Sequence, residues 1–287
     1  NFTVRYSKFL PLTCLIHCNC LLAIAPIRAE KSWLLRTAVR IYREIAVWGT
    51  VLLFDVESDN LSNFDLESAL AEVSVYVHHV DEVFSTYKNE SVISKLRRDE
   101  VQIAETPEEV IEVWNLCAEL KRITNGAFDP WLVPGGFDPS GLVKGWAADK
   151  CADILVESGA EHVQVNAAGD LALRGGYFDG VVKPWRIGVV NPENKNEIVH
   201  TFEITDGAIA TSGTYERGAH INDPYTGMIA IGAASATVVG PLGWLCDGLA
   251  TALMVAGEDG AKYFSQPELV GYQVFVIGRH ENSAWSI

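Results

Sequence analysis

Hydrophobic residues recur with the period of an α-helix over much of the first half of the chain. In the stretch 64–85 the apolar residues fall on one side of a helix, which predicts an amphipathic helix. These residues are Leu66, Leu70, Val73, Val77 and Val80. A further helix is predicted to follow the residues DPSG and to end at Gly159. His78 and His79 fall on adjacent faces of the first helix, where we expect surface or helix-edge positions rather than metal ligands.

A helix is also predicted over residues 106–126, and its ends carry recognisable signals. Thr106 is a candidate N-cap, Pro107 suits the first helical position, and Glu109 would complete a capping box with Thr106. The Asn-Gly pair at the other end is typical of the point where a helix stops.

Short strand-like runs, separated by Gly, Asn and Pro turns, replace the helical pattern after residue 160. They are HVQVN, DLALRG, WRIGVV, IVHTFEI and MIAIGAASATVVG. Strands are also predicted over 46–56 and 271–278, and a helix over 244–257. Because helices and strands occur in groups rather than in strict alternation, the predicted fold class is α+β, with one domain of mixed sheets and packed helices over 31–287.

Residues 1–30 have a pattern of their own and are set apart from this domain. Basic residues come first, an apolar stretch follows, and small residues lead to an exit at Ala29. This is the layout of a secretory signal or a membrane anchor. The apolar stretch also contains prolines and polar residues, so a spurious extension of a cytoplasmic protein fits as well. A cytoplasmic location and a membrane-associated or exported one therefore both stay open, depending on this segment.

The composition suits a folded protein with a large hydrophobic core. Hydrophobic residues make up 48% of the 287 residues, and aromatic residues 10%. The formal net charge is −15 and no stretch is rich in Lys and Arg, which argues against nucleic acid as a partner. A polyanionic ligand would need a metal ion or backbone amides to hold it.

The six cysteines fall into two groups. Cys117, Cys151 and Cys246 lie singly in predicted helices, where a free thiol behaves as a small hydrophobic side chain. The other three lie with a histidine in the run CLIHCNC. That run is embedded in an apolar stretch and has no second pair of ligands nearby, so we do not expect a zinc site there.

The helix predicted over 244–257 is apolar nearly all the way round, yet it contains one carboxylate and one hydroxyl. Asp247 and Thr251 are four residues apart and therefore share a face of the helix. A buried carboxylate without a partner is strongly unfavourable. Two readings of the pattern stay open here: the two side-chain oxygens converge on a cation, or the segment is not a helix.

Four other segments carry more Gly, Asp, Ser, Thr and His than a scaffold requires. They are residues 84–96, 126–147, 166–176 and 211–227. Tyr87 in the first could stack on a planar ring, and Lys144 in the second places a positive charge beside a helix N-terminus. His220 in the last is a candidate acid–base group near neutral pH. Each also fits an ordinary turn or surface position.

The order of these motifs is more informative than any one of them. Along the chain come STYKNES, GAFDP, DPSGLVKGWAADK, NAAGD, WRIGVVNP, ATSGTYE, HINDPYTG and LCDGLATAL. This series resembles the FAD:protein FMN transferase family, the ApbE-type flavin transferases, over roughly residues 45–280. The patterns H-I-x-D-P-x-T-G and D-x-L-A-T-A are each distinctive.

The resemblance implies an enzyme that cleaves FAD with a divalent metal, usually Mg²⁺. It would attach FMN to a Thr or Ser hydroxyl of an acceptor flavoprotein and release AMP. The metal ligands that it implies are Asp247, Thr251 and the main-chain carbonyl of Val143. His220 would be the general base for the acceptor hydroxyl. Membrane association would come only through residues 1–30 or through the acceptor.

The resemblance also implies side chains that contact the flavin, the adenosine or the phosphates. They are Trp48, Ser85, Thr86, Tyr87, Asp129, Lys144 and Asp170. Asp170 follows a Gly turn, so its side chain could instead serve only to fix that turn.

Some positions depart from the family pattern beside the implied site. The segment between GAFDP and DPSG is short, Asn222 replaces an apolar residue, and DPSG stands where relatives commonly have Asp-Leu-Gly-Gly. Acceptor choice is therefore less determined than flavin binding. Two alternatives stay open. One is a metal-dependent FAD pyrophosphatase that gives free FMN and AMP, and the other is a non-catalytic FAD-binding module.

Overall fold

Helices and strands both contribute heavily to the fold, which we describe from a computed structural model over residues 38–213, 221–279 and 283–287. The helices are α1 (Asn63–Phe84), α2 (Val92–Arg97), α3 (Glu108–Ile123), α4 (Ser140–Glu157) and α6 (Gly243–Ala256), with 3-10 turns η1 (Ile103–Glu105), η2 (Gly257–Ser265) and η3 (Pro267–Leu269). The strands are β1 (Val39–Val47), β2 (Thr50–Ser58), β3 (His162–Ala167), β4 (Asp170–Arg174), β5 (Tyr177–Phe178), β6 (Val182–Lys183), β7 (Trp185–Asn191), β8 (Asn194–Ile204), β9 (Gly207–Gly213), β10 (Ser235–Gly240), β11 (Gln273–Ile277) and β12 (Ala284–Ser286). The α+β prediction is confirmed.

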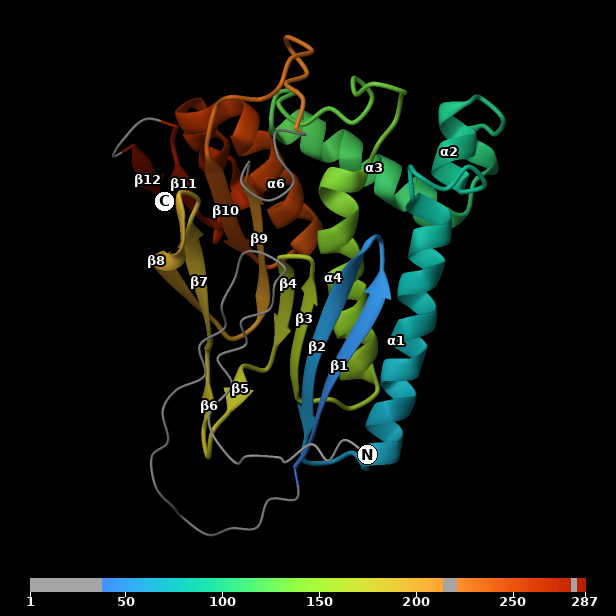
Figure 1. The fold of residues 1–287 in the computed structure, drawn as a ribbon, viewed down its shortest axis with the longest axis vertical. Helices are drawn as coiled ribbons and strands as arrows, with labels where there is room; N and C mark the ends of the chain where they lie inside the picture. Colours follow the sequence, from blue (N-terminus) through green and yellow to red (C-terminus); the bar gives the residue numbers. More distant parts are fainter. Residues whose placement is uncertain (1–37, 214–220, 280–282) are drawn as a thin grey trace, which may run out of the picture.

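Within the described residues, eight of these strands form one sheet, in the order β1-β2-β3-β4-β9-β10-β11-β12. Every neighbouring pair is antiparallel. Helices α1, α4 and α6 pack along one face of the sheet (Figure 1). The hairpin of β7 and β8 packs on part of the other face, where Leu173 and Ile209 meet Ile187 and Phe202.

The hydrophobic core lies between the sheet and the helices, as the alternation along the strands requires. On β2, Leu52, Phe54 and Val56 point to the helices and are almost fully buried. On α1, the apolar side that the sequence predicted faces the same core, because Leu66 and Val73 are fully buried there. The predicted helix over 64–85 is therefore confirmed, with a capping box at Ser62.

The strand predicted over 46–56 is wrong, because the chain reverses inside it. Trp48 and Gly49 have φ values of 58° and 69° and join β1 to β2 as a two-residue turn, with Val47 opposite Thr50. Two successive residues with positive φ are typical of a type I′ hairpin, whose twist matches that of the strands. The Trp-Gly pair was the turn signal that the prediction missed.

The capping box predicted at Thr106 and Glu109 does not form. The Thr106 hydroxyl donates back to the carbonyl of Ile103, at 2.7 Å, because a 3-10 turn precedes the helix. Helix α3 then begins at Glu108, and Glu109 pairs with the Nε2 atom of His79 at 2.7 Å. The Glu109 side chain thus links α3 to α1 instead of closing its own helix.

The strand pattern around the second half of the sheet also differs from the prediction. Of the run 228–240, only residues Ser235–Gly240 form a strand. Strand β9 was not predicted, because its Gly, Ala, Thr and Ser residues resemble a loop. It lies between β4 and β10 with α6 packed against it, and small side chains allow those elements to approach closely.

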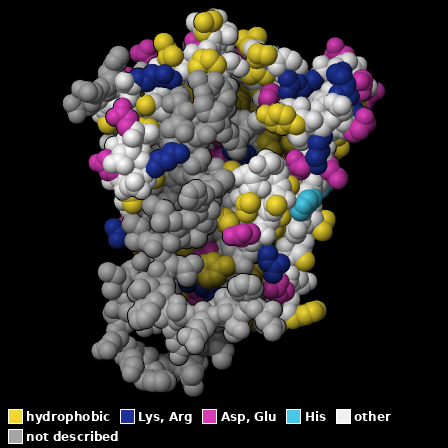
Figure 2. All heavy atoms as spheres, viewed as in Figure 1, with side chains coloured by type: hydrophobic (Ala, Val, Ile, Leu, Met, Phe, Trp, Pro, Cys, Tyr) yellow, Lys and Arg dark blue, Asp and Glu magenta, His cyan; other side chains and the backbone are white. Residues whose placement is uncertain are grey.

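Cys117, Cys151 and Cys246 are buried free thiols, as predicted. Residues 1–30, including Cys14, Cys18 and Cys20, lie outside the described residues. No helix in the described part of the chain is both long enough and apolar enough to span a membrane. Acidic and basic side chains lie close together around α2 (Figure 2), where Lys95 pairs with Glu90 at 3.1 Å.

Candidate active site between two helices and a strand

Helices α4 and α6 approach each other closely at two glycines. A Cβ atom on Gly145 would lie 2.2 Å from the carbonyl oxygen of Gly243, which is far inside van der Waals contact. Only a residue without a side chain allows the backbones to come this near. The first turns of both helices therefore lie side by side, and the residues next to the two glycines lie close together.

Asp247 lies at this crossing and is almost completely buried, with 2% of its surface exposed. Its carboxylate accepts a hydrogen bond from the backbone N–H of Gly145 at 3.2 Å. The ammonium group of Lys144 lies 3.1 Å from one carboxylate oxygen and 3.0 Å from the other. The buried Asp247 carboxylate therefore has two partners, the Gly145 N–H and the Lys144 ammonium, and both come from α4.

Asp170 belongs to the same cluster, although it starts strand β4. Its Oδ2 atom lies 2.9 Å from the Lys144 ammonium, yet among the described residues this buried oxygen has no hydrogen-bond partner of good geometry. The preceding turn is closed by Asn166, whose Oδ1 accepts from the N–H of Gly169 at 2.8 Å. The Asp170 side chain is thus not needed to fix the turn and points into the cluster.

The charges in the cluster do not balance. Burial and the nearby Asp247 carboxylate raise the pKa of Asp170 to about 7, against the opposing effect of Lys144. Burial would lower the pKa of Lys144, but the two carboxylates more than offset it and raise that pKa. With two carboxylates and one ammonium, the ionised cluster keeps an excess of one negative charge in a poorly solvated place.

Thr251 lies one helical turn beyond Asp247 on α6. Its hydroxyl oxygen is 3.4 Å from the hydroxyl oxygen of Ser212, which belongs to β9. A Cβ on Gly141 would lie 3.2 Å from the Thr251 hydroxyl, so the start of α4 packs directly beside it. Val143 follows in the same first turn of α4. The three predicted metal ligands therefore come from α4 and α6 where these helices pack together.

The donor set suits a hard divalent cation. A carboxylate, a hydroxyl and a main-chain carbonyl are oxygen ligands of the kind that Mg²⁺ prefers, and this ion takes few protein ligands and keeps several waters. A carbonyl already bonded within a helix still has a second lone pair. The described residues hold no group of three His, Cys, Asp or Glu arranged for a metal. The excess negative charge of the cluster, which remains after Lys144 has paired with both carboxylates, nevertheless fits a cation here.

Ser212 is the neighbour that sequence reasoning missed. It lies in the run ATSG, which was quoted for its place in the motif order and not for its hydroxyl. Thr211, next to it, donates its backbone N–H to the Asp170 carboxylate. Strand β9 therefore also contributes to the cluster, which no local pattern indicated.

The residues predicted to contact the flavin lie at the ends of β1 and α1. Trp48 forms the hairpin turn, and its indole N–H donates to the carbonyl of Val77 at 3.1 Å. Ser85 ends α1, where its hydroxyl accepts from the N–H of Tyr87 at 3.3 Å. Tyr87 is 96% exposed and Thr86 is half-buried. An exposed aromatic ring is available to stack on a ligand.

Asp129 is buried and already has partners. Its carboxylate pairs with Lys121 at 2.6 Å and accepts from the N–H of Trp131 at 3.1 Å. The neighbouring Phe128 ring lies 3.1 Å from the position of a Cβ on Gly141, so this segment flanks the start of α4. Asp129 therefore lies close to that helix start, in a structural ion pair.

His220 lies outside the described residues. The following segment folds as a turn around Asp223, which accepts from the N–H of Tyr225 at 2.8 Å and from the Thr226 hydroxyl at 2.9 Å. The Tyr225 hydroxyl donates to the carbonyl of Asn125 at 2.6 Å and fastens the turn to the end of α3. The D-P-Y-T-G motif is thus accounted for by turn formation.

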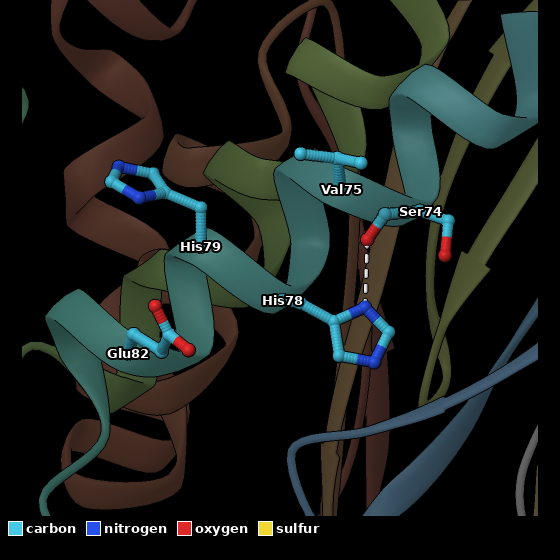
Figure 3. A pocket seen from close by; sticks show the side chains of 5 residues that line it. All are labelled: Ser74, Val75, His78, His79 and Glu82. Atoms are coloured by element: carbon cyan, nitrogen blue, oxygen red, sulfur yellow. Dashed lines mark hydrogen bonds between the residues drawn. The ribbon is translucent and has the colours of Figure 1, made fainter.

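A shallow depression on the exposed side of α1 does not coincide with this cluster. It is lined by Ser74, Val75, His78, His79 and Glu82. Figure 3 shows the two imidazoles pointing apart, with the Nδ1 atom of His78 bonded to the carbonyl of Ser74 at 2.7 Å. Because His79 is engaged with Glu109 instead, the pair does not form a metal site.

Two relatives with curated names are similar to this chain over part of its length. The chain is 40% identical over 132 residues to the FAD:protein FMN transferase of Vibrio cholerae, covering 42% of this chain and 39% of that protein. It is 32% identical over 156 residues to the FAD:protein FMN transferase of Escherichia coli K12, covering 51% of this chain and 43% of that protein. The aligned segments thus span about two fifths of the length of these relatives.

Solved structures share the fold over a larger part of the chain. The flavin transferase ApbE from Vibrio cholerae superposes with a TM-score of 0.74 at 23% identity, covering 87% of this chain and 97% of that one. The ApbE protein from Thermotoga maritima gives a TM-score of 0.72 at 23% identity, covering 83% and 94%. The ApbE family model matches residues 48–135 and 134–276, most of the chain, and the chain therefore belongs to the ApbE family.

Proposed function

We propose that this chain is an FAD:protein FMN transferase. It would cleave the pyrophosphate of FAD, attach the FMN phosphate to a Thr or Ser hydroxyl of an acceptor flavoprotein, and release AMP. The observation that carries the proposal is the buried cluster of Asp247, Asp170 and Lys144 beside Thr251, in a chain of the ApbE family. The names of the curated relatives support the same activity.

The metal site of the proposal consists of Asp247, Thr251 and the carbonyl of Val143. These residues would hold Mg²⁺ between α4 and α6. The ion, when bound, would neutralise charge on the pyrophosphate and stabilise the charge that develops on the transferred phosphoryl group. Such help matters in a chain with a formal net charge of −15, which otherwise repels a dinucleotide.

The remaining residues would bind and orient FAD. Tyr87, exposed at the end of α1, would stack on the isoalloxazine ring, with Ser85 and Thr86 bonding its edge and Trp48 lining the same region. Lys144 would offer its ammonium to a phosphate. Asp129 would lie near the adenosine part, held in place by its ion pair with Lys121.

His220 would act as the general base. The acceptor hydroxyl loses its proton to the imidazole as its oxygen forms a bond to the phosphorus of the FMN moiety, and the bond from that phosphorus to the oxygen of AMP breaks. AMP leaves with the electron pair of that bond. This role is assigned from the H-I-x-D-P-x-T-G motif, since His220 lies outside the described part of the chain.

The test is incubation of the protein with FAD, MgCl₂ and candidate acceptor flavoproteins. AMP is quantified, and covalent flavin is read by fluorescence on a denaturing gel. We expect AMP and flavin-labelled acceptor in equal amounts, and neither with Asp247→Ala that remains folded. AMP with only free FMN would identify a pyrophosphatase, and tight FAD binding without AMP at any Mg²⁺ concentration would identify a binding module. Full activity of Asp247→Ala would overturn the metal assignment.

A further inference from the structure

The ammonium group of Lys144 touches both acidic side chains of the cluster. It lies 3.0 Å and 3.1 Å from the two oxygens of Asp247 and 2.9 Å from Oδ2 of Asp170. We propose that Lys144 is a built-in counter-cation of the metal site, which neutralises Asp247 in the metal-free protein and competes with the divalent ion for it. This inference rests on the metal site of the proposed function and adds a control of its affinity.

The geometry of the carboxylate supports competition. Nearly equal distances place the Lys144 ammonium in front of both Asp247 oxygens, where an ion bound to that carboxylate would have its strongest attraction. The backbone N–H of Gly145 occupies one further direction on Oδ2. A divalent ion must therefore share the remaining lone pairs with Lys144 or displace it, and a +1 and a +2 charge at this separation repel each other.

Lys144 is the member of the cluster that can move. Asp247 and Asp170 are held by backbone N–H groups and leave 3% and 5% of their side chains exposed. The Lys144 side chain is 24% exposed, and its ammonium lies only 3.5 Å from one further carbonyl, that of Ser140. Because the side chain is partly exposed and its stem is flexible, the ammonium can leave Asp247 when a divalent ion arrives.

The charge of Asp170 then decides how far Lys144 competes. In the wild type, the Lys144 ammonium interacts with both carboxylates. When Asp247 binds the divalent ion, the ammonium can stay paired with Asp170. Without Asp170, the Lys144 ammonium would pair with Asp247 alone. Asp170 thus favours metal binding as the alternative partner of Lys144, and it need not touch the ion.

The test is a titration of the full chain with Mn²⁺ in the absence of FAD, with free Mn²⁺ measured by electron paramagnetic resonance. We expect Lys144→Met to bind Mn²⁺ at least about tenfold more tightly than the wild type and Asp170→Asn about tenfold more weakly. The double variant Lys144→Met/Asp170→Asn keeps the net charge of the cluster and is expected to return to within about threefold of the wild type. Lys121→Met, which loses the separate ion pair with Asp129, is the matched control and should bind as the wild type does.

Each outcome separates this inference from the proposed function. If Asp247→Ala binds Mn²⁺ as the wild type does, the metal site lies elsewhere, and both the metal assignment of the proposed function and the competition by Lys144 are refuted. If Asp247→Ala loses binding but Lys144→Met binds no more tightly than the wild type, the site stands and the competition is refuted. A double variant as weak as Asp170→Asn would make Asp170 a direct ligand and also refute it. Should Lys144→Met not fold, the charge-balanced double variant still decides the question.

Discussion

The hydroxyl of Thr251 is the residue-scale feature that most needs a function. It lies on an otherwise apolar helix, beside a buried carboxylate and 3.4 Å from the hydroxyl of Ser212. A packing role would be met by any side chain of this shape, whereas a metal ligand requires the oxygen itself. Replacing the Thr251 hydroxyl while keeping the shape of the side chain therefore distinguishes the two roles.

Thr251→Val removes the oxygen and keeps the shape of the side chain. We expect it to lower Mg²⁺-dependent AMP release by at least about tenfold, because one of few protein ligands is lost, whereas Thr251→Ser keeps the oxygen and most of the activity. The dependence of the rate on Mg²⁺ concentration measures the effect. Equal rates for the Val and Ser variants would show that the oxygen is not a ligand.

The role of His220 as the general base is predicted from the motif alone. His220→Ala should bind FAD as tightly as the wild type, while flavin transfer falls by roughly 10²–10⁴-fold, the usual contribution of a general acid–base group. Fluorescence titration gives the binding constant, and the labelled acceptor gives the rate. His78→Ala, on the exposed side of α1, is the control and should transfer at the wild-type rate. If His220→Ala transferred flavin as fast as the wild type, the general base would be another residue.

At the scale of elements, the site depends on how α6 is attached to α4. Helix α6 has no side chain of its own capping its N-terminus, and the N–H of Gly243 is bonded by Asp149 from α4. Burial raises the pKa of Asp149, and the Gly243 N–H and Arg174 at 3.2 Å act against that rise. This contact and the bond from Gly145 to Asp247 fasten the two helices at two points, one helical turn apart.

Asp149→Ala should therefore destabilise the fold. It leaves the Gly243 N–H without its acceptor and removes one of the two carboxylates paired with Arg174, a loss on the order of 2 kcal/mol. Asp153 offers a matched control, because it pairs with the same Arg174 at 3.0 Å but is 54% exposed. Asp153→Ala should lose less than about 1 kcal/mol. Urea unfolding measures both, and equal losses would contradict the assigned role of Asp149.

At the scale of the whole molecule, ligand binding and stability are linked. Because the proposed site joins α4, β4, β9 and α6, an ion and a dinucleotide bound there stabilise only the folded chain. A ligand at a hundred times its Kd adds about 2.7 kcal/mol, which for a chain of this size is roughly 5 °C or somewhat more in Tm.

We therefore expect MgCl₂ and FAD together to raise Tm by roughly 5 °C, and EDTA to remove the part due to the metal. Differential scanning calorimetry of the wild type and Asp247→Ala checks this. The variant should show no increment on adding MgCl₂ to the FAD complex. The same Mg²⁺-dependent increment in both proteins would mean that the ion binds away from Asp247.

Local periodicity determined much of the fold before the structure was known. The helix over 63–84 follows from apolar residues spaced at three and four positions, the helix over 108–123 from the signals at its ends, and the helix over 243–256 from its long apolar run. Each of these is a property of the segment by itself. Local register also placed Asp247 and Thr251 on one face of their helix. What the local pattern could not resolve was the Trp48–Gly49 turn, because hydrophobic residues continue through it on both sides.

The sequence alone thus determined the fold class, most helices, and the pair of oxygens on the last long helix, because each depends on neighbours within a few residues. Only the tertiary structure decided that Lys144 and Asp170 join Asp247, and that β9 lies beside them with Ser212. Those contacts span distances of 26 to 103 residues and depend on glycines that let α4 and α6 come together. The packing of backbones that are distant along the chain fixes such contacts, and no short pattern records it.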